Sequence, residues 1–413
     1  MISLLVLAAA LLAGAIVTRL PFLFLGSYLI VALLVLSRFW VWRMRKGLRV
    51  HRSFAPRLFV GETTTVTIHL TNQGILPIPW LNVREGIPLR LASYDAVRHV
   101  ASLRPRGSAV MTYELPATRR GFHRLGPMSV RYGDVFGISS EELLIDTPEF
   151  LIVYPEIAPI PAFRMPSSTP FGEMRSNQRI YEDPLRVIGV RDYQSGDSQR
   201  LINWKATASA GRLLVRKLEP AVSHEVQLFV DLSPSSYSRE WRESAPETSI
   251  VVAASVATYL INNRQSVGLA VNGADPLVLG GHRVVQHAEA VRRMAKRYPR
   301  LSIGRGRAHL MSILELLARV QVLEGEGAAD MVTAGSVGLP WGSTLILITG
   351  LRSRGLLDSL VGQRKLGHRV IVVFTDPSAA NLGTAAARAA GLTAMAITGK
   401  DKMSAWGDHR ATV

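Results

Sequence analysis

The stretch Val226-Gln-Leu-Phe-Val-Asp231 decides the fold of the C-terminal half of this chain. It is a short apolar run that ends at a carboxylate, a pattern typical of a buried strand that reaches a polar edge. After it, apolar runs of strand length alternate with segments whose apolar residues recur at helical spacing. Alternating strands and helices give right-handed crossovers, so we predict a mostly parallel, doubly wound α/β domain over residues 226–413.

The elements of this domain follow from the period of their apolar residues. Strands are expected at residues 226–231, 266–271, 343–349, 369–375 and 392–397. Helices are expected at residues 247–262, 309–320, 355–366 and 379–390. Doubly wound sheets bind ligands at the carboxyl ends of their strands, so functional side chains are expected just after those ends.

An Asp-x-Ser-x-Ser loop follows the first of these strands. It places Asp231, Ser233 and Ser235 close together, and their oxygens are ligands that a hard divalent cation such as Mg²⁺ accepts. A site of this kind needs further oxygen ligands from neighbouring loops, so the three residues predict part of a metal site. The alternative interpretation is an acidic turn in which the Asp and Ser side chains cap the following segment.

The segment before residue 226 is dense in arginine, aspartate and aromatic residues. It spans residues 161–225 and begins with a Pro- and Ser-rich stretch, residues 161–179, that predicts a linker or ordered loop. Trp, Tyr and Arg dominate interface hot spots, so one interpretation is a partner-binding surface; the other is a structural network of ion pairs between two domains. The candidate partner-binding residues are Arg191, Tyr193, Asp197, Arg200, Trp204 and Lys205.

Residues 53–160 have the pattern of a β domain. Val66, Ile68 and Leu70 alternate with polar residues, which predicts a strand with one buried face. Further short strands are expected at residues 108–115, 122–125, 128–132 and 149–154. Turn signals recur about every ten residues, and the spacing favours a β-sandwich of immunoglobulin type.

The N-terminus carries two uncharged apolar runs, residues 2–18 and 21–37, within residues 1–42. Each approaches the ~20 residues that a helix needs to cross the hydrocarbon core of a bilayer. We therefore predict a transmembrane helical hairpin whose tight turn lies near Arg19. A cleaved signal peptide is the alternative, but the chain lacks a charged leading region and a small-residue cleavage site, and a second apolar run follows.

The charges after the second run predict its orientation. Basic residues from Arg38 to Arg52 occur with no acidic residue among them, and the positive-inside rule places this end in the cytoplasm. Phe39, Trp40 and Trp42 are expected to form an aromatic belt at the membrane surface. The expected location is the inner or plasma membrane, as a multi-pass protein with its soluble domains in the cytoplasm.

Composition excludes several classes of function. Eight basic residues precede the first acidic residue, Glu62, so only about +9 of the formal charge of +17 belongs to the soluble part, and the overall charge does not favour a nucleic-acid partner. The chain has no cysteine, which removes disulfides, thiolate metal sites and cysteine nucleophiles. Walker A, GxSxG and HExxH motifs are also missing from the sequence, so no enzyme is expected.

One long motif resembles a known family. The run Arg191-Asp-Tyr-Gln-Ser-Gly-Asp-Ser-Gln-Arg-Leu-Ile-Asn-Trp-Lys205 is similar to the signature of the bacterial domain-of-unknown-function-58 family. The resemblance continues at residues 214–219 and 230–233, and Arg120-Gly121 and Asp134-Val-Phe-Gly137 resemble the β-domain pattern of the family. It implies a membrane protein with a β-sandwich and a von Willebrand factor type A-like domain. Residues 282–300 look like an insertion.

The resemblance also implies what surrounds the candidate site. In the von Willebrand factor type A fold, a Thr on a second loop and an Asp after a later strand complete the metal site; residues 306–312 offer no Thr, and Gly350 stands where the Asp is expected. Such proteins are often encoded beside MoxR-type AAA ATPases and transglutaminase-like membrane proteins. We therefore expect a non-enzymatic, membrane-anchored scaffold or adaptor that docks a cytoplasmic partner in assembly or envelope-related processes. A divalent-metal-dependent ligand binder is the alternative.

Overall fold

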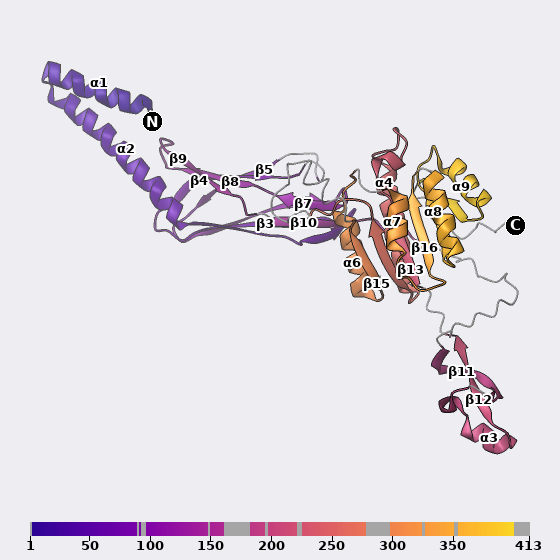
Figure 1. Cartoon of the computed structure of the whole chain (residues 1–413). Helices are drawn as coiled ribbons and strands as arrows, with labels where there is room; N and C mark the ends of the chain where they lie inside the picture. The colour runs from indigo at the N-terminus through magenta and orange to yellow at the C-terminus, as the bar shows by residue number, and fades with distance from the viewer. Residues whose placement is uncertain are drawn as a thin grey trace.

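The computed structural model describes residues 2–88, 91, 96–147, 149–160, 182–194, 197–220, 225–277, 298–323, 327–350 and 354–399 (Figure 1). Within these ranges the strands form five sheets, and an apolar helix stands near the N-terminus. The mixed α/β prediction is therefore confirmed. The expected linker at residues 161–179 and most of the expected insertion at residues 282–300 lie outside the described residues.

Two helices pack against each other at the N-terminus, as Figure 1 shows. Helix α1 (Ile2–Thr18) is rich in Leu and Ala, and helix α2 (Pro21–Gly47) begins with a proline, which its first turn tolerates because that position needs no backbone donor. Arg19 takes a positive φ of 55° in the turn between them. Ser27 Oγ donates to the carbonyl of Ala8 across the pair, at 3.1 Å. Helix α2 is long and apolar enough to cross a membrane, whereas α1 is a shorter apolar helix.

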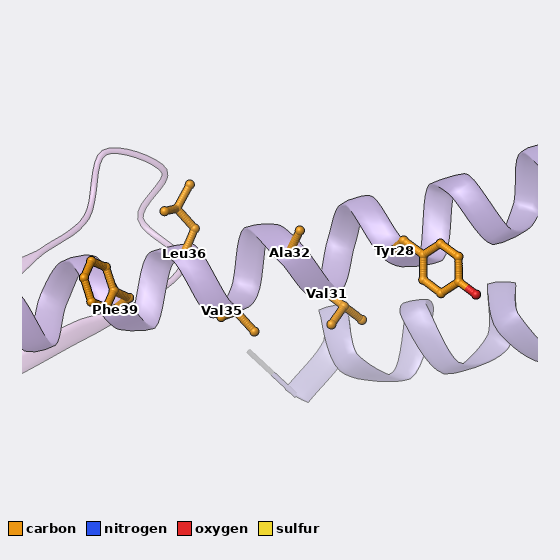
Figure 2. Close-up of a pocket in the computed structure, with 6 residues that line it drawn as sticks. All are labelled: Tyr28, Val31, Ala32, Val35, Leu36 and Phe39. Carbon is orange, nitrogen blue, oxygen red and sulfur yellow. The ribbon is translucent and has the colours of Figure 1, made fainter.

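Helix α2 continues past the apolar run and enters the next domain. Val41 and Met44 are buried in the core of the β domain, residues 48–160, and Trp40 Nε1 donates to the carbonyl of Pro77 at 3.3 Å. Trp40 therefore faces protein, while Phe39 and Trp42 of the expected aromatic belt stay exposed. On another side of α2 an apolar groove is lined by Tyr28, Val31, Ala32, Val35, Leu36 and Phe39 (Figure 2).

The β domain holds three small sheets. Their strand orders are β1-β3-β6, β5-β4-β8-β9 and β2-β10-β7. The strands are β1 (Leu48–Ser53), β2 (Arg57–Phe59), β3 (Thr63–Asn72), β4 (Ile78–Gly86), β5 (Ala96–Leu103), β6 (Ser108–Pro116), β7 (Gly121–Leu125), β8 (Met128–Gly133), β9 (Ser140–Ile145) and β10 (Glu149–Tyr154). In β3 the residues alternate between buried and more exposed positions as predicted, and the three sheets share one apolar core.

A buried arginine ties three strands of the β domain together. Arg52 on β1 pairs with Glu85 on β4 and, at 2.9 Å, with Glu149 on β10. Burial by itself lowers the pKa of Arg52, but the hydrogen bonds and charges of Glu149 and Glu85 outweigh it and raise that pKa above its usual value. A charge buried here is tolerated because both its partners are in place.

The α/β domain, residues 225–399, is built on a six-stranded sheet of order β15-β14-β13-β16-β17-β18. The strands are β13 (Glu225–Val230), β14 (Ser266–Val271), β15 (Arg300–Gly304), β16 (Thr344–Thr349), β17 (Arg369–Phe374) and β18 (Thr393–Ala396). All neighbouring pairs are parallel except β14 and β15. The central strands read as continuous apolar runs because both faces of the sheet are buried.

Helices cover both faces of this sheet. Helices α4 (Ala245–Asn262) and α6 (Arg307–Arg319) pack on one face. Helices α7 (Ala328–Gly335), α8 (Arg354–Lys365) and α9 (Ala380–Ala389) pack on the other. The strands and helices predicted for this domain are confirmed, whereas β15 and α7 were not predicted.

A small separate unit lies between the two domains in sequence. Strands β11 (Glu182–Asp192) and β12 (Leu214–Pro220) form a two-stranded antiparallel sheet, and helix α3 (Trp204–Ala210) lies in the connection between them. The unit adds no strand to the sheets of either domain, and Figure 1 draws it apart from them. It contains the motif from Arg191 to Lys205, of which the structure describes residues 191–194 and 197–205.

One arginine joins the β domain to the α/β domain. Arg120, immediately before β7, donates to both carboxylate oxygens of Glu247 on α4, at 2.7 and 2.8 Å. Its Nη1 donates to the carbonyls of Leu317, Ala318 and Val320 at the end of α6, at 3.0, 3.2 and 2.9 Å. Carbonyls at the end of a helix lack helical partners and carry partial negative charge, so a guanidinium satisfies both needs at once.

Substituting this arginine tests the domain junction. Arg120→Ala leaves the carbonyls at the end of α6 without their donor, so we expect the free energy of unfolding to fall by about 2 kcal/mol. Proteolysis should then separate the β domain from the α/β domain faster than in the wild type. Arg124→Ala is the matched control, because the ion pair between Arg124 on β7 and Asp146 is exposed and worth at most about 1 kcal/mol. Equal effects of the two variants in thermal unfolding and proteolysis would contradict the role given to Arg120.

Candidate functional site

Asp231 lies at the switch point of the six-stranded sheet. It directly follows β13, whose neighbours are β14 on one side and β16 on the other. Ligand crevices of doubly wound sheets form at this position, where the strand order reverses. The side chain of Asp231 is nevertheless completely buried. The site therefore depends on what surrounds the carboxylate.

Donors from three strand ends surround this carboxylate. Asn272, after β14, donates its Nδ2 to Oδ1 at 2.6 Å, and the backbone N–H of Ser233 reaches the same oxygen at 3.2 Å. Thr349, at the end of β16, donates its hydroxyl to Oδ2 at 2.8 Å. Both carboxylate oxygens are thus held by the protein itself, as a buried charge requires.

The side chain of Tyr237 packs next to the end of β16 and completes the site. Its hydroxyl donates to the carbonyl of Asp231 and lies 2.9 Å from Ser249 Oγ. Burial, followed by the charge of Asp231, raises the pKa of Tyr237, so the phenol stays neutral and acts as a donor. Its ring lies against Gly350, where an added Cβ would stand 2.3 Å from the ring atom Cδ1. The position at which the resemblance expects an Asp is therefore filled by an aromatic ring.

The residues present do not fit a divalent cation in this arrangement. The hydroxyls of Ser233 and Ser235 lie 2.9 Å apart and bond to each other. Asp376, the buried carboxylate after β17, accepts from the backbone N–H groups of Ser238 and Ser378 at 2.7 and 2.8 Å. In the part of the chain that the structure describes, no group of three or more His, Cys, Asp or Glu residues surrounds a common point. A cation here would compete with the hydrogen bonds that these oxygens already make within the protein.

The second candidate site holds its ion pairs within one small unit. Arg191 donates to both carboxylate oxygens of Asp197 at 2.7 Å, and the backbone N–H of Gln194 reaches Asp197 at 2.9 Å. The hydrogen bonds from Arg191 and from that backbone N–H hold the pKa of Asp197 below its usual value. Asp192 pairs with Arg212 at 3.2 Å. These pairs join residues of the same unit, so they shape its loop.

The remaining candidate residues of this unit differ in exposure. Tyr193 is half-buried, and its backbone pairs with Leu213. Asn203 caps α3 through its side chain, and the buried pair Ile202 and Val215 makes a small core beneath it. Trp204 begins α3 and is 67% exposed. Lys205 follows Trp204 directly and Arg200 stands four positions before it, and both are exposed. The unit thus exposes one large aromatic side chain and two basic ones.

Sequence reasoning missed most of the residues that hold Asp231. Asn272, Tyr237, Ser249 and Thr375 were not singled out, and Thr349 was noted only as the end of a strand. Asn272, Thr349 and Thr375 stand at the carboxyl ends of β14, β16 and β17, so their place at the end of a predicted strand could have identified them. Tyr237 and Ser249 come close to the site only in the folded chain.

Residues 189–334 match the family described as "Protein of unknown function DUF58". A Bacillus subtilis relative, named "Uncharacterized protein YeaD", is 24% identical over 266 residues, which cover 60% of this chain and 64% of the relative. The match thus spans less than two thirds of that protein.

Solved structures show only weak likeness. The CARDB domain of the PF1109 protein from Pyrococcus furiosus is 19% identical over 26% of this chain and 91% of its own, with a TM-score of 0.20. Red sea bream transglutaminase is 14% identical over 26% of this chain and 15% of its own, with a TM-score of 0.19. Scores this low support no statement about fold or function.

The hydrogen-bonded state of Asp231 predicts how the site responds to magnesium. Asp231→Ala leaves the amide of Asn272 and the hydroxyl of Thr349 buried without an acceptor, which should lower the free energy of unfolding by about 2 kcal/mol. Ser235→Ala, at an exposed hydroxyl, should have little effect. We expect millimolar Mg²⁺ to leave the thermal midpoint of the wild type unchanged. A rise in that midpoint with Mg²⁺, lost in Asp231→Ala, would show instead that the site binds the cation.

Proposed function

This chain belongs to the DUF58 family, and on that premise we propose that it is a non-enzymatic, membrane-anchored scaffold or adaptor that docks a cytoplasmic partner. The observation that carries the proposal is the exposed Trp204. Large aromatic side chains are enriched at the centres of interfaces, where flanking polar groups exclude water. The docking face comprises Trp204 with its exposed neighbours Arg200 and Lys205, on a loop that the Arg191–Asp197 pair stabilises.

The chemistry at the switch point supports a role without catalysis. The carboxylates of Asp231 and Asp376 are both buried and both accept hydrogen bonds from the protein. An acid, base or nucleophile has to reach a substrate atom, and neither carboxylate presents a free oxygen to solvent. The network therefore stabilises the carboxyl edge of the sheet.

The N-terminal helices support attachment to a membrane. We infer that α1 and α2 both cross the bilayer, so that the chain passes twice and both ends lie in the cytoplasm. Arg45 and Lys46 at the end of α2, together with Arg38 and Arg43, support that orientation through the positive-inside rule. The proposed location is the bacterial inner membrane.

The two soluble domains support the architecture that the family implies. The strand order β15-β14-β13-β16-β17-β18, with an antiparallel edge strand, suits a von Willebrand factor type A-like domain. The sheets β1-β3-β6 and β5-β4-β8-β9, which share one core, suit an immunoglobulin-like β-sandwich. In this proposal the small unit of β11, α3 and β12 displays the partner site, and the β domain lies next to the membrane helices.

The proposed partner is a MoxR-type AAA ATPase, with a transglutaminase-like membrane protein as the other candidate. Both come from the gene neighbourhood that is typical of the family. A divalent-metal-dependent ligand binder that uses Asp231, Ser233 and Ser235 is the alternative function. It would require the donors Asn272 and Thr349 to release the carboxylate, so the observed hydrogen bonds favour the scaffold.

Comparing two exposed tryptophans tests the docking face. Trp204→Ala should reduce co-purification of a co-expressed MoxR-type ATPase, in mild detergent, by about ten-fold or more, as the loss of a hot-spot aromatic does. Trp341→Ala is the matched control, because Trp341 in the α/β domain is 70% exposed and lies outside the docking face. Retention of the ATPase by Trp204→Ala would contradict the proposal, and so would equal loss in both variants.

A further inference from the structure

The turn between β8 and β9 exposes two adjacent apolar side chains. Val135 is 61% exposed and Phe136 is 63% exposed, and no described element covers them. Exposed apolar surface at the tip of a turn is unfavourable in water and often marks a place where something else binds. The position of the turn in the molecule indicates what that is.

The turn is rigid. The backbone N–H of Asp134 donates to the carbonyl of Ser139, and the N–H of Ser139 donates back to the Asp134 carboxylate, both at 3.2 Å. Gly137 takes a φ of 67°, a conformation that suits glycine. Trp80 Nε1 donates to the carbonyl of Asp134 at 3.1 Å and anchors the turn to β4. The tip is therefore held in place before any partner arrives.

A hydrogen bond places this turn beside the apolar helix. Ser37 Oγ on α2 donates to Ser139 Oγ at 2.7 Å, and both side chains are buried. Ser37 lies ten positions before Gly47, where α2 ends and the β domain begins, which corresponds to about 15 Å along the helix. The turn thus extends along α2, away from the rest of the β domain, as Figure 1 shows for the start of β9.

Ser37 stands where the apolar part of α2 ends. The uncharged run of residues 21–37 is about 25 Å long as a helix, close to the ~30 Å thickness of a bilayer core, and Arg38 follows it. Phe39 and Trp42 are exposed just beyond, and the ammonium of Lys46 lies 3.9 Å from the centre of the Trp42 ring. Aromatic and basic residues of this kind gather at the level of the lipid headgroups.

We propose that the β8–β9 turn inserts Val135 and Phe136 into the membrane surface beside α2. The proposal rests on the membrane anchoring put forward above, and it adds a second contact between the protein and lipid. Apolar side chains that enter the boundary between headgroups and acyl chains gain by leaving water. Because α2 packs into the core of the β domain at Val41 and Met44, helix and domain tilt together, and a lipid contact at the turn limits that tilt relative to the bilayer.

Single cysteine labels test this contact in the full chain, because the native sequence has no cysteine. F136C and L144C, each carrying the environment-sensitive dye NBD, are placed in nanodiscs of phosphatidylglycerol and phosphatidylethanolamine, with or without lipid bearing a shallow doxyl quencher. Leu144 is the matched control. It is 62% exposed and lies near the end of β9 that is farther from Ser37. We expect doxyl lipid to quench position 136 at least about two-fold more than position 144.

Carbonate extraction of the same chains distinguishes a failure of the membrane anchoring from a failure of the lipid contact at the turn. If the chain resists extraction and doxyl lipid leaves position 136 unquenched, the lipid contact is overturned while the anchoring stands. A dye at position 136 that shifts to the blue without doxyl quenching points to a protein partner and also overturns the lipid contact. A chain released by carbonate overturns both the anchoring and the contact. Labelling V135C gives a second probe of the same tip if F136C does not fold.

Discussion

The contact between Arg120 and the end of α6 is the interaction on which the arrangement of the domains depends. One guanidinium, 8% exposed, satisfies carbonyls of one helix and the carboxylate of another, and both helices belong to the domain opposite its own. The backbone N–H of Ala158 donates to the Ser255 hydroxyl on α4 at 2.9 Å, and Tyr154 packs in the core of the α/β domain. Since α2 enters the core of the β domain at Val41 and Met44, packed contacts run from the apolar helix to the six-stranded sheet. These contacts position the two larger domains relative to the helix, whereas the proposed docking face lies on the small unit of β11, α3 and β12, which adds no strand to their sheets.

The carboxyl edge of the sheet has been filled by the protein's own groups. A fold that usually leaves a crevice at its switch point here brings together Asn272, Thr349 and Tyr237 around Asp231. The decisive element is steric: Gly350 leaves room for the ring of Tyr237, and any side chain at that position would collide with it. A buried carboxylate that already has its donors is a stabilising centre and has little left for a ligand. The proposed docking face therefore lies elsewhere, at the exposed residues around Trp204.

The sequence predicted the parts of the fold whose pattern is local. The apolar runs of β13, β16 and β17 are long enough to identify as buried strands, and β3 shows its alternation plainly. Strand β4 was hidden because it begins in the Pro-rich stretch around Pro79, and every residue of β9 stays partly or fully exposed, so neither shows a clear period. The small sheet of β11 and β12 carries a Pro and a Gly within β11, which argue against a strand locally.

The candidate site was predicted only in part, for the same reason. Asp231, Ser233 and Ser235 are adjacent in sequence, so their loop was visible, but the donors to Asp231 come from strands 41 and 118 residues away. The glycine at position 350 looked like a missing ligand. Only the folded chain shows that the space belongs to Tyr237. The role of Arg120 was likewise out of reach, since its partners lie 127 to 200 residues further along the chain.

Photocrosslinking in native membranes tests directly whether the exposed face around Trp204 binds a protein partner. A benzophenone amino acid is placed at Lys205 in the docking face, and at Leu382, which is 67% exposed on α9, as the comparison. We expect one discrete crosslinked partner from position 205 and none of that mass from position 382. The absence of any adduct from position 205, or the same adducts from both positions, would contradict the proposal that this exposed face holds a partner at the membrane.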